Sequence, residues 1–414
     1  MLKKVLKNTF KYIKQNYGQV ILILVLLTMC FLSFKYGKYI LHNDNYSSEL
    51  NPLLSLSRYF ESPAWRGYRV LGFASDSEQA DIFRNAVFTI FESILPSWFV
   101  GQIFYFICLF VGSISIAALV SKFVGESRMR EYKSASFLVA GTIYATTLWT
   151  MWTFYQSMAP YVANYGFLPL LLLAIYMYTK DQKITHLLFL FLSSLLLTSA
   201  FVIATLFVTD FILIFSFILF LNISSLKKGK VLGIVKTLGV FLLTQLFWVL
   251  PFIYYTITTS QDIIGSYTNR TITSSIIDLE SDAQSSLNSA RFFNRSLFEL
   301  DGEEYLFPMS EEFQTYDFYK VIGLLPAFFA ILALVFGMFR KEWKILFWVS
   351  IALISWFLIK AVNPPFANVF LWIQENVPLF KQVFRWPFSK LGETYLIAIT
   401  ILSTFGILYF HTFL

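Results

Sequence analysis

An acid in a short polar segment, LHNDNYSSELNP at 41–52, is the first candidate for chemistry in this sequence. Asp44 follows a long apolar stretch directly and is surrounded by small polar residues. A carboxylate held at a membrane surface can take a proton from an acceptor hydroxyl group, which is general base catalysis. The alternative is a helix cap, because Asp and Asn side chains at helix ends bind free backbone groups. The residues alone leave both interpretations open.

The segment FRWPFSK, residues 384–390, places two cations just before the last long apolar stretch. Arg385 offers a planar guanidinium that matches phosphate oxygens, and Lys390 adds a point charge. Pro387 fixes the backbone between them. Cations at a membrane surface also extend to the phosphates of surrounding lipids. The segment therefore predicts either a clamp for one lipid phosphate or an interfacial anchor.

Asp210, in the apolar stretch ATLFVTDFILIF, is the one acid that we place deep within a predicted span. Ionisable groups in a membrane core are costly and are therefore functional candidates. Pairing with a hydroxyl group or with another helix would explain this residue equally well.

The charged and aromatic segment 58–84 is expected to form a mostly structural network at the membrane surface. A few residues in and near it are suited to an acceptor glycan, because aromatic rings can stack on sugar faces. These candidates for acceptor binding are Glu49, Arg58, Trp65 and Tyr68. Asp44 and Glu49 could also contribute ligands to a divalent metal, but two carboxylates do not define a site. Metal use is left open, and no other cofactor is predicted.

The elements that carry these residues are expected to lie in a membrane. The 414 residues are 57% hydrophobic and 14% charged, whereas soluble domains carry about 25% charged residues. Apolar stretches of about 20 residues predict an all-α polytopic membrane protein with about ten transmembrane helices. Both cysteines, Cys30 and Cys108, fall inside such stretches and are expected to be packing residues. The predicted spans are 18–40, 98–120, 135–153, 161–178, 186–203, 205–222, 236–256, 319–339, 344–361 and 391–413.

The charge distribution predicts which ends of these spans face the cytoplasm. With the N-terminus inside, the inner segments hold eighteen Lys and Arg residues against four Asp and Glu residues. All other segments, without Asp210, hold fourteen against twenty. This positive-inside asymmetry requires a hairpin at 186–222 and places Asp44 outside. The inner segments are 1–17, 121–134, 179–185, 223–236 and 340–344.

The outer segments are longer than the inner ones and carry the candidate site residues. They are 41–97, 257–318 and 362–390 within a single domain, 1–414. Two amphipathic stretches, 85–97 and 366–380, are expected to form helices at the interface. The sequence has no Walker loop, no GxSxG motif and no HExxH motif. It therefore gives no support for nucleotide hydrolysis, serine hydrolase chemistry or a histidine-rich metal site.

Several of these features together resemble the GT-C superfamily of membrane glycosyltransferases, which use polyprenyl-phosphate-linked sugars. The features are the acid after the first span, NPLLSLSRYFESPAWRGYRVLG at 51–72, PYVANYGFLPLLLLAIY at 160–176, and FRWPFSK before a late span. The chain is most similar to the membrane half of the α-(1→3)-arabinofuranosyltransferases. Those enzymes are much longer, so the chain is expected to be a short relative or a fragment that lacks a C-terminal region.

The resemblance implies an inverting transfer of a sugar from a polyprenyl-phosphate donor to a glycan or lipid-glycan acceptor. It implies that Asp44 is the catalytic base and that Arg385 and Lys390 bind the donor phosphate. The site would lie on the outer face of the plasma membrane, with the lipid-linked donor, the glycan acceptor and membrane lipids as partners and no nucleic acid. The alternative is a lipid-linked polysaccharide polymerase or ligase, or a flippase of cell-envelope glycans.

Overall fold

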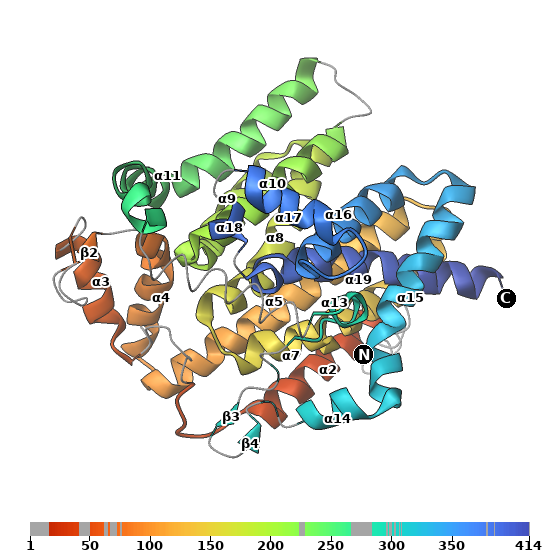
Figure 1. Cartoon of the computed structure of the whole chain (residues 1–414), viewed down its shortest axis with the longest axis horizontal. Coiled ribbons are helices and arrows are strands. Elements are labelled where there is room, and N and C mark those ends of the chain that lie inside the picture. The colour runs from red at the N-terminus through yellow and green to blue at the C-terminus, as the bar shows by residue number, and fades with distance from the viewer. Residues whose placement is uncertain are drawn as a thin grey trace, which may run out of the picture.

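Helices make up most of the protein in the computed structural model (Figure 1). The only strands among the described residues form two small antiparallel pairs, β1 (Trp65–Arg66) with β2 (Phe73–Ala74) and β3 (Leu300–Asp301) with β4 (Glu304–Tyr305). The structure describes residues 16–40, 50–61, 65–66, 73–74, 77–222, 228–265, 284–294, 297, 300–301, 304–305, 307, 309–377, 380–384 and 386–413.

Seven helices in the described part of the chain are long and apolar enough to cross a membrane. The chain is therefore a multi-pass helical membrane protein, as its composition predicts. The hairpin at 186–222 consists of two of these helices joined by the short turn η4 (Thr198–Val202). The seven spans are α5 (Ser97–Gly125), α8 (Ala159–Asp181), α9 (Ile184–Leu197) continued by η4, α10 (Ala204–Asn222), Val231–Thr258 of α11 (Lys228–Gly265), α15 (Asp317–Arg340) and α19 (Pro387–Phe413).

Three of the ten predicted spans are shorter or broken. The first ends at Ser33 in α2 (Tyr17–Ser33), and Phe34 is extended, so 34–40 is not helical. The span predicted at 135–153 is two helices, α6 (Lys133–Thr146) and α7 (Leu148–Tyr155), because Thr147 is extended and its hydroxyl group caps α7 at Thr150 N. The span predicted at 344–361 is the 17-residue α16 (Trp343–Ile359). Hydropathy alone does not detect such breaks.

The remaining helices and turns belong mostly to the predicted outer segments. Helices do form in both stretches that were predicted to be amphipathic, as α4 and α17. These elements are α3 (Pro52–Glu61), η2 (Ser77–Asp81), α4 (Ile82–Glu92), η3 (Arg130–Tyr132), α13 (Ser286–Ala290), α14 (Ser310–Thr315), α17 (Ala367–Asn376) and α18 (Phe380–Val383).

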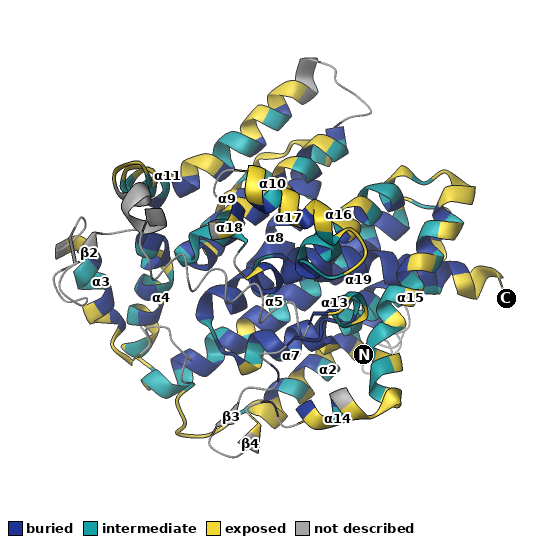
Figure 2. Ribbon diagram, in the orientation of Figure 1, coloured by how far each residue is buried: buried dark blue, intermediate teal, exposed yellow. Residues whose placement is uncertain are grey.

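α5, α8 and α19 are buried along most of their lengths, whereas α15 has a large exposed surface (Figure 2). Small residues let α19 approach its neighbours closely, as is common for helices that pack within membranes. A Cβ atom on Gly406 would lie 1.9 Å from the carbonyl oxygen of Phe329 in α15. The hydroxyl group of Ser403 donates to Pro326 O of α15 at 2.6 Å. Contacts of this kind fix the helices around α19.

Glu126, directly after α5, joins the ends of three helices. Its Oε1 accepts hydrogen bonds from Tyr176 OH at 2.5 Å and Lys180 Nζ at 2.6 Å, both from α8. Its Oε2 accepts one from Lys344 Nζ of α16 at 2.6 Å. The structure thus brings three of the predicted inner segments to one end of the molecule.

Acid is expected to weaken this cluster. Burial by itself raises the pKa of Glu126, but hydrogen bonds from Lys180, Lys344 and Tyr176 outweigh burial and lower the pKa to about 2. The cluster therefore contributes its full stability above the ordinary pKa of 4.5 and loses it as pH falls toward about 2. In thermal unfolding, the Glu126→Gln variant should be less stable than the wild type at neutral pH. It should also lose less stability than the wild type when the pH is lowered. Parallel acid losses in the variant and the wild type would contradict this.

The predicted outer segments meet at the other end of the helices. The hydroxyl group of Ser77 in η2 donates to Val202 O in η4 at 2.6 Å, which ties the first outer segment to the α9–α10 turn. Trp356 Nε1 donates to Ser286 O at 2.9 Å, and the Ser286 hydroxyl group donates to Pro364 O. The second and third outer segments are therefore also in contact.

Candidate functional site

Several predicted site residues lie outside the described residues. These are Asp44, Glu49, Tyr68 and Arg385, and Trp65 is described only as part of β1. Arg58 is half-buried in α3. The described part of the site therefore consists of Lys390 and the groups around the ends of α2, α5 and α7.

Lys390, in the first turn of α19, binds an aromatic residue of α8. Its Nζ donates to Tyr161 OH at 2.9 Å and lies 5.3 Å from the centre of the same ring. Tyr161 in turn contacts Trp152 of α7, with 5.3 Å between the ring centres. Lys390 is partly buried, so this contact holds its ammonium group at a fixed place beside α7.

A cavity of about 630 Å³ lies where α2, α5, α6 and α7 meet. Its volume is typical of a small-molecule site. Apolar side chains form most of its wall, among them Met29 and Cys30 of α2, Leu109 of α5 and Phe154 of α7. Cys30 and Cys108 are both buried and unpaired, as predicted, and Cys30 takes part in this wall.

Two lysines stand at the end of this cavity where α2 has ended. Lys35 and Lys38 line it, and its described lining contains no Asp or Glu. The buried amide of Gln102 fixes their backbone, since its Oε1 accepts from Lys35 N at 3.0 Å. The Nε2 of Gln102 donates to Lys35 O and Lys38 O, each at 2.7 Å. The arrangement suits an anionic group joined to an apolar body.

The short helix α7 separates this cavity from Lys390. Met151 and Phe154 line the cavity, whereas Trp149 and Trp152 stack on each other, with 4.8 Å between ring centres, and contact Phe388 of α19. Lys390 is not part of the cavity's described lining. The two lysines and Lys390 therefore approach α7 from different sides.

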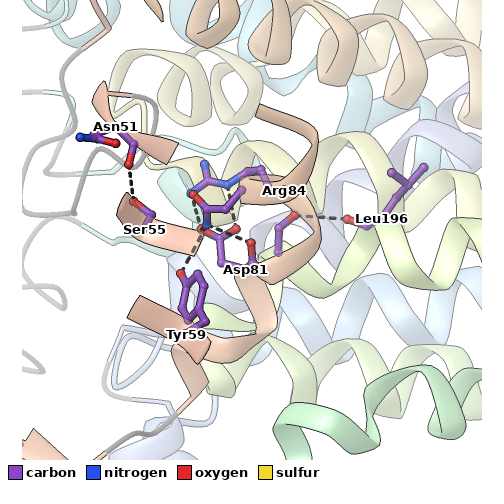
Figure 3. Close-up of polar contacts among 8 residues, drawn as sticks. Asn51, Ser55, Tyr59, Asp81, Arg84 and Leu196 are labelled. Carbon is purple, nitrogen blue, oxygen red and sulfur yellow. Dashed lines mark hydrogen bonds and ion pairs between the residues drawn. The ribbon is translucent and has the colours of Figure 1, made fainter. Parts of the chain in front are cut away.

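Two charged residues of the first outer segment, Asp81 and Arg84, form a salt bridge (Figure 3). Arg84 donates to both carboxylate oxygens of Asp81, at 2.7 and 2.6 Å, and both side chains are nearly buried. Asn85 Nδ2 donates to Asp81 Oδ2 at 3.1 Å and to Tyr59 OH of α3 at 3.3 Å. These bonds join α3, η2 and α4.

Asp210 is fully buried in α10, where the amide of Asn164 in α8 acts on its carboxyl group. The sequence singled out Asp210 as the one acid deep within a span. Glu393 of α19 is a second acid buried inside a candidate span, with only 2% of its surface exposed. Glu393 lies near the start of its helix, so its sequence position suggested an interfacial residue. The apolar residues that follow it, YLIAITIL, were the available signal of a deeper position.

No protein-family model matches this chain, and no curated protein or solved structure matches it either. The chemistry of the site therefore has to come from its own residues.

Proposed function

We propose that this chain is a glycosyltransferase that moves a sugar from a polyprenyl-phosphate donor to a glycan or lipid-glycan acceptor at the outer face of the plasma membrane. The cavity of about 630 Å³ supports this proposal most directly, because it combines apolar walls with Lys35 and Lys38. Ile40 also lines it and is the last described residue before the segment that contains Asp44. The proposed base therefore follows the proposed donor site closely along the chain.

In the proposed reaction, the acceptor hydroxyl group attacks the anomeric carbon of the donor sugar. Asp44 accepts the hydroxyl proton as the new glycosidic bond forms. The bond between the anomeric carbon and the phosphate oxygen breaks, and the polyprenyl phosphate leaves with the bonding electrons. Lys35 and Lys38, which line the cavity, stabilise the negative charge that develops on this oxygen. A single displacement of this kind inverts the anomeric centre.

The lysines are expected to supply most of the selectivity for the donor. The prenyl tail already lies among apolar lipid tails in the bilayer, so its transfer to the apolar walls of the cavity gains little hydrophobic free energy. Each lysine near a membrane surface contributes about 1 kcal/mol toward an anion. Lys35 and Lys38 therefore select the phosphate end and orient it toward the segment after Ile40.

A lipid-linked polysaccharide polymerase or ligase would use the same cavity, and a donor with a single sugar separates it from the proposed transferase. A flippase needs a polar path across the membrane. The described lining of the cavity comes instead from one end of α2, α5 and α6. This position favours a transferase over a flippase.

Removing the two lysines tests the proposal. The double variant Lys35→Ala, Lys38→Ala should bind polyprenyl phosphate about 30-fold more weakly, because about 2 kcal/mol of attraction is lost. Native mass spectrometry of the purified full chain with this lipid measures the change. Lys320→Ala is the matched control, since Lys320 pairs with Asp317 at the start of α15, away from the cavity. Unchanged affinity in the double variant would contradict the proposal.

A further inference from the structure

The carboxyl group of Glu393 lies between α19, α6 and α7. Its Oε2 accepts a hydrogen bond from Trp149 Nε1 of α7 at 2.7 Å. Its Oε1 makes a very short contact with Tyr144 OH of α6. All three residues are buried, and the two partners precede Glu393 by more than 240 positions.

The Tyr144 hydroxyl group has a second neighbour, the carbonyl oxygen of Tyr165 at 2.7 Å. In a regular helix this carbonyl would accept from the backbone N–H four residues later. That residue is Pro169, inside α8, and proline has no N–H. A buried carbonyl group without a donor is costly. The Tyr144 hydroxyl group therefore supplies the donor that Tyr165 O lacks.

Counting hydrogens indicates whether Glu393 carries a proton. A phenol has one hydrogen to donate, and Tyr144 donates it to Tyr165 O. The contact between Tyr144 OH and Glu393 Oε1 then needs a hydrogen from the carboxyl group. The arrangement that satisfies both contacts is a hydrogen bond from Glu393 O–H to Tyr144 O and one from Tyr144 O–H to Tyr165 O. Oε2 of the neutral acid still accepts from Trp149, so every group is satisfied.

The surroundings also disfavour a charge on Glu393. The titratable groups that face it or its partners are Tyr144 on α6, Tyr165 on α8, Cys108 on α5 and Asp210 on α10. Asp210 is an acid, and two carboxylates that face each other in a membrane core repel, so the two acids disfavour a charge on each other. The nearest cation on α19 is Lys390, and its Nζ binds Tyr161 instead.

Trp149 connects this carboxyl group to the cavity. Its ring packs directly on α19, since a Cβ atom on Gly392 would lie 2.1 Å from it. The next residues of α7, Thr150 and Met151, line the cavity. We propose that Glu393 is a positioning residue which holds its own proton and, through Trp149, fixes α7 as a wall of the cavity. The link to lipid binding rests on the proposed function, whereas the protonated contact does not.

The variant Glu393→Gln tests this inference. A glutamine amide donates to Tyr144 through its NH₂ group and accepts from Trp149 through its oxygen, so it replaces a neutral acid but not a carboxylate. Thermal unfolding of the purified full chain is measured from about pH 5 to about pH 9, on either side of neutrality. Because the folded state keeps this proton and the unfolded chain releases it in water, the wild type should lose stability as pH rises. The variant should match the wild type at low pH and lack that loss.

A spectroscopic measurement accompanies the unfolding experiment. The infrared difference spectrum between the wild type and Glu393→Gln at neutral pH should contain the carbonyl band of a protonated carboxyl group. Glu126→Gln is the matched control, because Glu126 also accepts from a tyrosine but has two lysines as partners. That variant should lose stability at neutral pH and show a carboxylate band instead.

The outcomes separate this inference from the proposed function. An unstable Glu393→Gln at all pH values, or a carboxylate band for Glu393, would overturn the inference even if polyprenyl phosphate binds the cavity. A stable Glu393→Gln with the protonated band supports it even if that lipid does not bind. Where the lipid binds, its affinity should fall at high pH in the wild type only, and equal falls in both proteins would overturn the role of Glu393 in positioning α7.

Discussion

Changing Asp44 to asparagine is expected to reduce glycosyl transfer by about 10²- to 10⁴-fold, the usual contribution of a general base. An amide has nearly the same shape as a carboxylate but does not accept a proton at neutral pH. The variant should therefore still fold, insert and bind polyprenyl phosphate. Transfer is measured with the purified enzyme, a lipid donor with one sugar, and an acceptor glycan.

The control for this variant is Asp317→Asn, since Asp317 starts α15 and pairs with Lys320 in an exposed position. It should retain full transfer. Full transfer by Asp44→Asn would remove Asp44 from the mechanism. Comparison with the double lysine variant then separates the two roles, because the lysine changes should weaken donor binding, whereas Asp44→Asn should slow only the chemical step.

Changing Gly406 to alanine is expected to destabilise the protein by about 1–3 kcal/mol, the usual cost of adding a methyl group to a closely packed core. The new Cβ atom would lie 1.9 Å from the carbonyl oxygen of Phe329. The obstacle is backbone, so α15 and α19 would have to move apart. This movement would also stretch the bond from Ser403 to Pro326 O. Thermal unfolding in detergent measures the effect.

Gly239 offers a matched control inside α11. A Cβ atom there would have no neighbour within 4 Å. Alanine is favoured over glycine in a helix by about 1 kcal/mol, so Gly239→Ala should be neutral or stabilising. A loss of stability of the same size in both variants would show that close approach of α15 and α19 is not the cause.

The sequence alone determined the helical class, the positions of most spans and the hairpin around η4. Each of these depends on the apolar character of about 20 consecutive residues, which a local stretch contains in full. The charge pattern also grouped the ends of α5, α8 and α16 correctly, since Lys180 and Lys344 converge on Glu126.

Only the tertiary structure decided the wall that α7 builds and the partners of the Glu393 carboxyl group. These depend on partners far away in the chain. Glu393 contacts Tyr144 across 249 positions, and Gln102 organises the lysines of the cavity across more than 60. Whether a carboxyl group in a membrane keeps its proton depends on the donors and acceptors that surround it after folding. Hydropathy and charge along the chain contain no information about those neighbours.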